Sequence, residues 1–474
     1  MSEFTLADQE EPMIAMCKMV VNTKYEDLPR KVVNYAKRSI LDTVAVTIGG
    51  SAMEGIPVIV DFVKNKGGKP ESLIPFYGGK VPAIDAGLAI GPMSRAMDLG
   101  DVHEEAGHCS EYTLPTVLAA TGLRDKVTGK EFITAFVVGQ EVLVRIGIAF
   151  KGISKGLPMG RSSGHYIFGC VAAAGKLLGL SLAEIENAEG IARGKTQPHD
   201  TAMYHPATLM VRVHHGFVCR DSIEACLLAK RGITGPRQGV LTGPRGYLAF
   251  AKWGTDLDAL TKGLGNKWEM LKTMMKPHAA CKCTHTAIGG ILDQMKEYNF
   301  KVDDIASIHI DESSVNWAVV CEPIEEKWNP QTVPECQFSL PYVVATAAYD
   351  NDIFLDSYTP EAMARKDVRN LMTRISARED PSLPPFAARI NTTLKNGRRY
   401  SKECIHIKGH PKNPFTEQEL IDKFKKCVPY SAYKLSDSVV DSVIKALLNL
   451  QEVDDVVKSV ILPLTPEEAT GMEG

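Results

Sequence analysis

Several long stretches of the first 260 residues carry apolar side chains at helical spacing but have no strongly polar face. A helix of this kind is stable only when other helices surround it, because it offers no side suited to water. Glycine, proline or a polar cap bounds each stretch, and the stretches lie at residues 83–97, 113–123, 130–149, 166–179, 182–193 and 216–231. The pattern predicts a large all-helical domain.

The chain changes character after Trp253. A helical segment at residues 284–298 is followed by short alternating segments at 305–311, 374–377 and 387–394. Asn396-Gly397 is typical of a tight turn, here into a further strand at 399–405, and helical spacing returns from Thr416. We therefore predict a mainly α fold. Residues 1–265 and 405–474 form the all-helical domain, and residues 266–404 form a smaller, inserted α+β domain.

Charge and cysteine usage exclude several classes of protein. The 474 residues have a formal net charge of -3, which provides no basic surface for nucleic acid or for an anionic membrane. The start of the chain is acidic at residues 8–11 where a signal peptide would be basic and then apolar, and no run of 18 apolar residues occurs. The 11 cysteines have no regular spacing, which is typical of free thiols in a reducing compartment and not of a disulfide framework. We expect a cytoplasmic protein that acts on a small molecule.

Residues 97–109 concentrate four acids and two imidazoles between two apolar helical stretches. Ionisable groups held between buried helices have shifted pKa values, and such groups cluster where protons are transferred. Asp98 and His108 lie at the two ends of this turn, where the carboxylate can orient the imidazole or act as a base. The alternative is a helix cap and a structural histidine. We expect most of the charges between them to be solvated.

Two further segments offer cations just before apolar helices. Arg161 lies in a glycine-bounded turn at residues 160–165, and Arg212 precedes the His214-His215 pair. An arginine can grip a carboxylate with two parallel hydrogen bonds, and a helix start favours an anion. The alternative for the first segment is a close-packed helix entry. One of the two adjacent histidines is expected to be structural, because neighbours on a helix point to different faces.

Residues 276–285 form the other dense polar segment, with Lys276, Cys281, Cys283 and His285. A Cys-x-Cys-x-His pattern lacks the paired spacing of structural zinc sites, so we expect no metal there. Lys276 can hold a carboxylate or stabilise developing negative charge. The two cysteines can equally be packing residues.

Taken together, these segments resemble the MmgE/PrpD family, which includes 2-methylcitrate dehydratases, cis-aconitate decarboxylases and an iminodisuccinate epimerase. The resemblance implies a helical domain built from both chain ends, an inserted α+β lid domain, a homodimer, and an active site between the domains without a metal or organic cofactor. It rests on the order and spacing of Leu28-Pro29, residues 41–43, the turn from Asp98 to His108, residues 176–180, 214–216 and 227–236, Lys276, and residues 338–342.

The resemblance also implies roles for individual residues. Asp98 and His108 match the active-site aspartate and histidine of the family, and Lys276 matches its lid lysine. Cys281 stands where the decarboxylases have a histidine, and His285 falls on the common Thr-His pair.

This sequence departs from the family pattern at two places. Residues 159–164 replace a His-Pro-Thr-Gly-like motif, and Val211 stands where the family often has a lysine. The lost groups are of the kind that grip or protonate a tricarboxylate, so the substrate is expected to be a different acid. Arg161 and Arg212 are then candidate replacements as carboxylate anchors.

Removing a proton next to a carboxylate leaves a carbanion that needs cations and hydrogen-bond donors. We expect dehydration of a small hydroxy di- or tricarboxylate similar to 2-methylcitrate, the commonest activity that the resemblance implies. Epimerisation or isomerisation of a small dicarboxylate such as iminodisuccinate, decarboxylation of the cis-aconitate type, and a non-catalytic ligand-binding relative remain open. The expected catalytic residues are Asp98, His108 and Lys276, and the expected substrate-binding residues are Arg161, Arg212, His214, Cys281 and His285.

Overall fold

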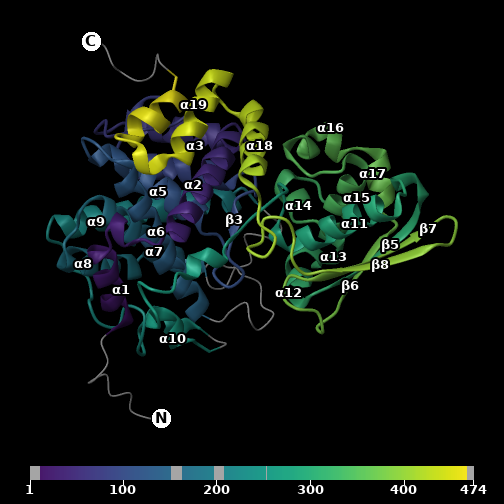
Figure 1. Ribbon diagram of the computed structural model, residues 1–474, viewed down its shortest axis with the longest axis horizontal. Helices are drawn as coiled ribbons and strands as arrows, with labels where there is room; N and C mark the ends of the chain where they lie inside the picture. Colours follow the sequence, from purple (N-terminus) through teal and green to yellow (C-terminus); the bar gives the residue numbers. More distant parts are fainter. Residues whose placement is uncertain (1–10, 151–162, 197–207, 252–253, 467–474) are drawn as a thin grey trace.

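A computed structural model of the chain describes residues 11–150, 163–196, 208–251 and 254–466. Helices dominate, and the fold is mainly α, as the sequence predicts (Figure 1). The N-terminal part contains α1 (Pro12–Asn22), α2 (Arg30–Gly50), α3 (Ile56–Lys66), α4 (Ala83–Arg95), α5 (Ser110–Ala120), α6 (Gly129–Ala149), α7 (Tyr166–Leu177), α8 (Leu182–Arg193), α9 (Met210–Lys230) and α10 (Leu257–Thr261), with a small ladder of β1 (Ser72–Leu73) and β2 (Lys80–Val81).

Helix α6 lies at the centre of the helical part. It starts with a capping box, in which Thr128 and Glu131 each bond the other's backbone N–H. The helix is long and apolar enough to cross a membrane, but its apolar window is entirely buried within the protein. It is therefore a core helix, which agrees with the absence of a polar face in its sequence.

Helices α4 and α9 cross at unusually short range. A Cβ atom added to Gly91 would lie 2.7 Å from the backbone nitrogen of Gly216, so the crossing requires glycine. Helix α9 begins at Met210, six residues before the predicted start at 216, because the polar residues there are buried rather than solvated. Arg212, His214 and His215 consequently lie inside a helix.

The α+β part contains a sheet of four strands in the order β6-β5-β7-β8. Strand β5 runs parallel to β6 and antiparallel to β7, and β7 and β8 form the predicted hairpin, against which α11 packs. The strands are β5 (Ile305–Glu312), β6 (Ile375–Glu379), β7 (Ala388–Leu394) and β8 (Arg399–Cys404), and the helices are α11 (His285–Tyr298), α12 (Ser314–Asn316), α13 (Ile324–Trp328), α14 (Val333–Gln337), α15 (Leu340–Asp350), α16 (Pro360–Met363) and α17 (Lys366–Met372).

The C-terminal helices return to the helical part. Helices α18 (Glu417–Cys427) and α19 (Asp437–Leu448) both pack against α2, so the C-terminal segment belongs with the N-terminal helices (Figure 1). The domain boundaries at 265/266 and 404/405 stay predictions.

A two-residue ladder joins segments that are far apart in the sequence. Strand β3 (Asp101–Val102), in the turn between α4 and α5, pairs antiparallel with β4 (Met274–Met275). This short ladder brings the lysine that follows β4 to the polar turn, and it thereby determines where the candidate site lies.

Candidate active site

Lys276 contacts the turn at Asp98. Its Nζ atom lies 2.6 Å from Oδ1 of Asp98 and donates to the Asp98 carbonyl at 3.1 Å. Both side chains are buried, so the ammonium and the carboxylate neutralise each other away from water. Two residues predicted from distant parts of the sequence therefore meet.

Asp98 has a second cationic partner and an unusual backbone. Arg95, in the last turn of α4, donates from Nη1 to the same Oδ1 atom. Burial alone would raise the pKa of Asp98, but Arg95 and Lys276 outweigh it and lower the pKa. Asp98 has a φ of 51°, in the left-handed region, where strain is most often found at functional sites.

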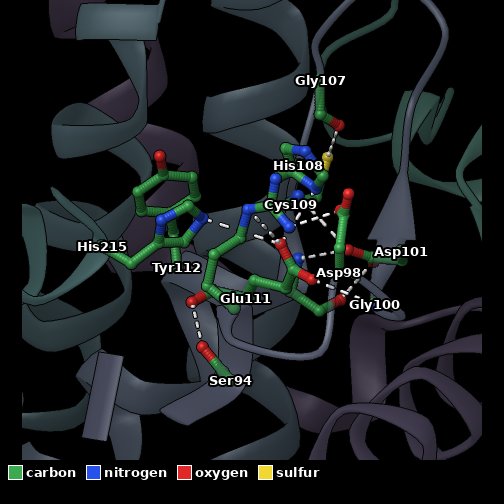
Figure 2. Close-up of polar contacts among 12 residues, drawn as sticks. Ser94, Asp98, Gly100, Asp101, Gly107, His108, Cys109, Glu111, Tyr112 and His215 are labelled. Carbon is green, nitrogen blue, oxygen red and sulfur yellow. Dashed lines mark hydrogen bonds and ion pairs between the residues drawn. The ribbon is translucent and has the colours of Figure 1, made fainter. Parts of the chain in front are cut away.

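Glu111, in the first turn of α5, occupies the centre of the polar cluster in Figure 2. Its Oε2 atom lies 2.9 Å from Nδ1 of His108 and 3.7 Å from Nε of Arg95, and its Oε1 atom accepts from the N–H of Gly100. A Cβ atom at position 100 would lie 2.1 Å from Oε1, so this approach requires glycine. Burial opposes the charge of Glu111, but the close contact with the His108 ring and the charge of Arg95 hold its pKa well below the usual range.

His108 is held by Glu111 rather than by Asp98, contrary to our expectation that Asp98 orients it. The contact with Glu111 lacks the alignment of a hydrogen bond, so the coupling is mainly electrostatic. Burial lowers the pKa of His108 more than the charge of Glu111 raises it. A neutral imidazole can accept a proton at neutral pH, and a small exposed fraction of 8% leaves His108 a route to solvent.

Tyr112 organises the two adjacent histidines of α9. Its hydroxyl lies 3.0 Å from Nδ1 of His214, and its ring stacks on His215 with centroids 3.8 Å apart (Figure 2). His215 lies between Tyr112 and Glu111, with Nε2 3.6 Å from Oε2 of the carboxylate. His214 instead faces a cavity of about 190 Å³ that Lys195 and other residues line. The two histidines thus do point to different faces.

Two residues of the group that we expected to be mostly solvated are buried. Asp101 accepts at Oδ1 from the backbone N–H groups of Ser110, at 2.8 Å, and of Cys109, at 3.2 Å, and it thereby supports the start of α5. Burial raises its pKa to about 6. His103 accepts at Nδ1 from two backbone N–H groups, and burial lowers its pKa to about 4. The β3–β4 ladder covers this turn, which explains why its charges are not solvated.

Arg212 lies near Asp98 and Arg95, and the charges of both residues contribute to its pKa. Its Nη1 atom donates to the carbonyl of Glu54 at 2.8 Å, whereas its buried Nη2 atom has no hydrogen-bond partner among the described residues. Burial lowers the pKa of Arg212 to about 10. The guanidinium therefore keeps donor capacity for an anion. Arg161 lies outside the described residues.

Cys281 lies in the turn before α11, and His285 is the first residue of that helix. His285 has Nδ1 2.9 Å from the carbonyl of Cys281 and Nε2 3.1 Å from that of His278. Both ring nitrogens thus face main-chain oxygens, so His285 stabilises the turn and has no free nitrogen for the substrate contact that we expected. Cys281 is buried, and the charges of Asp98 and Lys276 both contribute to the pKa of its thiol.

The buried imidazole of His215 predicts a loss of stability in acid. Burial lowers its pKa to about 3, so between about pH 6.5 and that value the unfolded chain binds a proton that the folded chain does not. Stability therefore falls as the pH falls. Denaturant unfolding at pH 7 and pH 5 gives the free energy of unfolding that each protein loses between the two pH values. This loss should be about 2 kcal/mol greater in the wild type than in His215→Gln. Equal losses would contradict the burial of a neutral imidazole.

Comparison with known proteins covers almost the whole chain. The MmgE/PrpD N-terminal domain matches residues 14–259, and the MmgE/PrpD C-terminal domain matches residues 278–449. The chain belongs to the MmgE/PrpD family. A cis-aconitate decarboxylase-like protein of Aspergillus oryzae is 28% identical over 90% of this chain and 91% of the relative. The cis-aconitate decarboxylase of Mus musculus is 26% identical over 92% and 90%, and that of Homo sapiens 26% over 91% and 90%.

Membership of the MmgE/PrpD family and these relatives give the chain the lyase-type function of the family. The candidate site draws on both family domains. Asp98, His108 and Glu111 lie within the N-terminal domain and Cys281 within the C-terminal domain, while Lys276 lies in the short connection between them. The resemblance inferred from the sequence is thus confirmed at the level of the family.

Sequence reasoning missed Arg95, Glu111 and Tyr112. Two of them carried a usable signal. Arg95 is the only cation in the apolar helix α4, and Glu111 follows His108 by three residues, which is the spacing of side-chain neighbours on a helix. Tyr112 carried none, since its contacts with α9 depend on tertiary packing.

Proposed function

We propose that the chain acts on a small di- or tricarboxylate by acid–base chemistry, and that it releases carbon dioxide from an unsaturated acid of the cis-aconitate type. The observation that supports this proposal best is the buried pair of Asp98 and Lys276 next to His108. Loss of carbon dioxide leaves an electron pair on the substrate carbon, and fixed cations stabilise that charge in a site without bulk water. The carbon then needs only a proton.

The charges near Asp98 suit this reaction. Arg95, Lys276 and Arg212 supply three cations against the two charges of Asp98 and Glu111, so the cluster favours a further anion. Arg212, whose Nη2 atom has no hydrogen-bond partner in the described part of the chain, is a candidate anchor for a carboxylate that stays on the substrate. Arg161 and His214 are proposed as further substrate contacts. His108, neutral and close to solvent, is proposed to move the proton.

The relatives support decarboxylation over the dehydration that we first expected. Three relatives named for cis-aconitate decarboxylation, or for likeness to it, align over about nine-tenths of the chain. Dehydration of a hydroxy acid stays the second candidate, because the family resemblance implies that Cys281 stands where the decarboxylases have a histidine.

Proton NMR of candidate acids with the purified protein tests the proposal. The protein should convert cis-aconitate or a close unsaturated analogue to a product with one carboxylate fewer, with carbon dioxide released in equal amount. Conversion of 2-methylcitrate to an unsaturated acid of unchanged carbon number would support dehydration instead. Hydrogen exchange in deuterium oxide without net product would indicate an epimerase, and absence of all three would contradict the proposed function.

Arg212→Ala should weaken substrate binding. A lost hydrogen bond to a charged group is worth about 1.5–3 kcal/mol, which corresponds to an increase of KM of roughly 10- to 100-fold with a smaller change in kcat. Steady-state kinetics would measure both constants. Arg231→Ala, at the exposed C-terminal end of the same helix, is the matched control and should behave as the wild type. An unchanged KM in Arg212→Ala would remove the proposed anchor.

We also propose that the protein is a homodimer, as the family resemblance implies. Light scattering of the purified protein should give twice the chain mass of 51.8 kDa. A monomeric mass together with full activity would contradict it.

A further inference from the structure

Lys423, in the C-terminal helix α18, contacts both segments that form the candidate site. Its Nζ atom donates to the carbonyl of Leu99 at 3.0 Å and to the carbonyl of Lys276 at 2.8 Å. Leu99 directly follows Asp98 in the chain, and Lys276 directly follows β4. One ammonium therefore joins the main chain on both sides of the buried pair of Asp98 and Lys276.

The ammonium of Lys423 has a buried counter-charge of its own. Its Nζ atom lies 2.6 Å from Oδ1 of Asp42, in α2, and both side chains are buried. Oδ1 of Asp42 has no hydrogen-bond partner among the described residues, so Asp42 acts on Lys423 through its charge. The hydrogen bonds of the ammonium go instead to the two carbonyls. Asp42 thus balances the charge, and Lys423 makes the contacts.

Three consecutive residues of the turn are each bound at the main chain by a buried charged side chain. They are the carbonyl of Asp98, bound by Lys276, the carbonyl of Leu99, bound by Lys423, and the N–H of Gly100, bound by Glu111. The left-handed φ of 51° at Asp98 costs free energy, and such a conformation persists only where its surroundings enforce it. The contact from Lys423 is the one that comes from the C-terminal segment.

The C-terminal segment contacts β4 at a second point. The N–H of Met275 donates to the carbonyl of Gly409 at 3.1 Å. A Cβ atom at position 409 would lie 1.9 Å from the carbonyl oxygen of Met275, so this approach requires glycine. The β3–β4 ladder has only two residue pairs, and so short a ladder is marginal by itself. Its position therefore depends on the segment that carries Gly409 and Lys423.

We propose that Lys423 is a positioning residue, which sets the ammonium of Lys276 and the carboxylate of Asp98 at their working distance; its role in turnover rests on the proposed function. Lys423 acts through the main chain of the two segments, by holding the carbonyls of Leu99 and Lys276 to one point. A displacement of about 1 Å at a reacting group can lower a rate about 100-fold. The C-terminal helix is then part of the active centre as well as of the fold.

Hydrogen-exchange mass spectrometry tests the positioning without any substrate. In Lys423→Met, peptides that contain β3 and β4 should exchange about 10- to 100-fold faster than in the wild type, because two hydrogen bonds from a charged donor are lost. Peptides of the core helix α6 should keep the wild-type rate. Lys425→Met is the matched control, since Lys425 lies on the same helix and pairs with Asp441 at the surface. It should leave all of these peptides unchanged.

Two outcomes of the exchange experiment would overturn the proposal. Unchanged exchange of β3 and β4 in Lys423→Met would show that Lys423 does not hold the ladder. Equally faster exchange in α6 would show that Lys423 stabilises the whole domain and not the site. If Lys423→Met is too unstable to purify, Asp42→Asn/Lys423→Met takes its place, because it removes both buried charges and leaves neither unpaired.

Kinetics of the same variants test the role in the reaction. Lys423→Met should lower kcat about 10- to 100-fold with KM within about threefold of the wild type, because the proposed anchor Arg212 remains. In Asp42→Asn/Lys423→Met the free energy of unfolding should move back toward the wild type while kcat stays low, since the two carbonyls still lack their donor.

Recovery of kcat in the double variant to within about threefold of the wild type would overturn the positioning role, because it would assign the whole effect to stability. Faster exchange confined to β3 and β4, in a protein that decarboxylates no acid, would instead contradict the proposed function and leave the contact of Lys423 with the two segments supported.

Discussion

Lys276→Met should reduce kcat/KM by about 100- to 1,000-fold, which is the usual effect of removing one fixed group that stabilises developing charge. The ammonium contacts Asp98 and is one of the fixed cations of the candidate site. Its removal leaves a buried carboxylate with Arg95 as its remaining cationic partner, so the free energy of unfolding should fall by about 3–5 kcal/mol. Steady-state kinetics and denaturant unfolding measure the two effects separately.

The double variant Asp98→Asn/Lys276→Met separates chemistry from stability. It removes both charges of the buried pair, so much of the lost unfolding free energy should return while kcat/KM stays low. If Lys276→Met alone is too unstable to purify, Lys276→Arg keeps the charge and serves as the second comparison. A value of kcat/KM within about threefold of the wild type in Lys276→Met would exclude Lys276 from the site.

His108→Asn should lower kcat by about 100- to 10,000-fold, the range for the loss of a positioned acid or base. His108 is buried against Glu111, but Arg95 remains beside that carboxylate, so this variant should still fold. Its lowered pKa also predicts that activity persists below the ordinary histidine range and falls only in more acidic solution. The pH dependence of kcat/KM measures this limb.

Glu111→Gln tests the direction in which Glu111 shifts the pKa of His108. The charge of Glu111 raises the pKa of His108, so its removal should lower that pKa and move the acidic limb of kcat/KM to still lower pH. If the acidic limb instead moves to higher pH in Glu111→Gln, the titrating group is not His108. The same conclusion follows if the limb is unchanged in Glu111→Gln and still present in His108→Asn.

Helical spacing was sufficient to predict most of the helical part from the sequence. The stretches at 130–149 and 182–193 become α6 and α8 almost residue for residue, because a capping box marks the start of each. The turn at Asn396-Gly397 likewise predicted the hairpin of β7 and β8. These signals are local, so no knowledge of the fold is needed to interpret them.

Several residues of the candidate site could be predicted from the sequence, but which of them contact one another could not. Asp98 and Lys276 were identified in segments 178 residues apart, and nothing in a two-residue strand indicates which other strand it will pair with. The same limitation explains why Asp98, rather than Glu111, was assigned to His108. A histidine's partner depends on where the helix starts, and α5 starts at Ser110, before the predicted position.

The β3–β4 ladder has a consequence for how the specificity of this protein can change. Because the aspartate and the ammonium come from two widely separated stretches of the gene, neither half inherits a working centre when recombination splits them. A new substrate preference therefore requires coordinated change on both sides of the crossing. Exchange of single domains between relatives is therefore expected to yield hybrids that fold but are inactive, wherever the sequences on the two sides of the ladder have diverged.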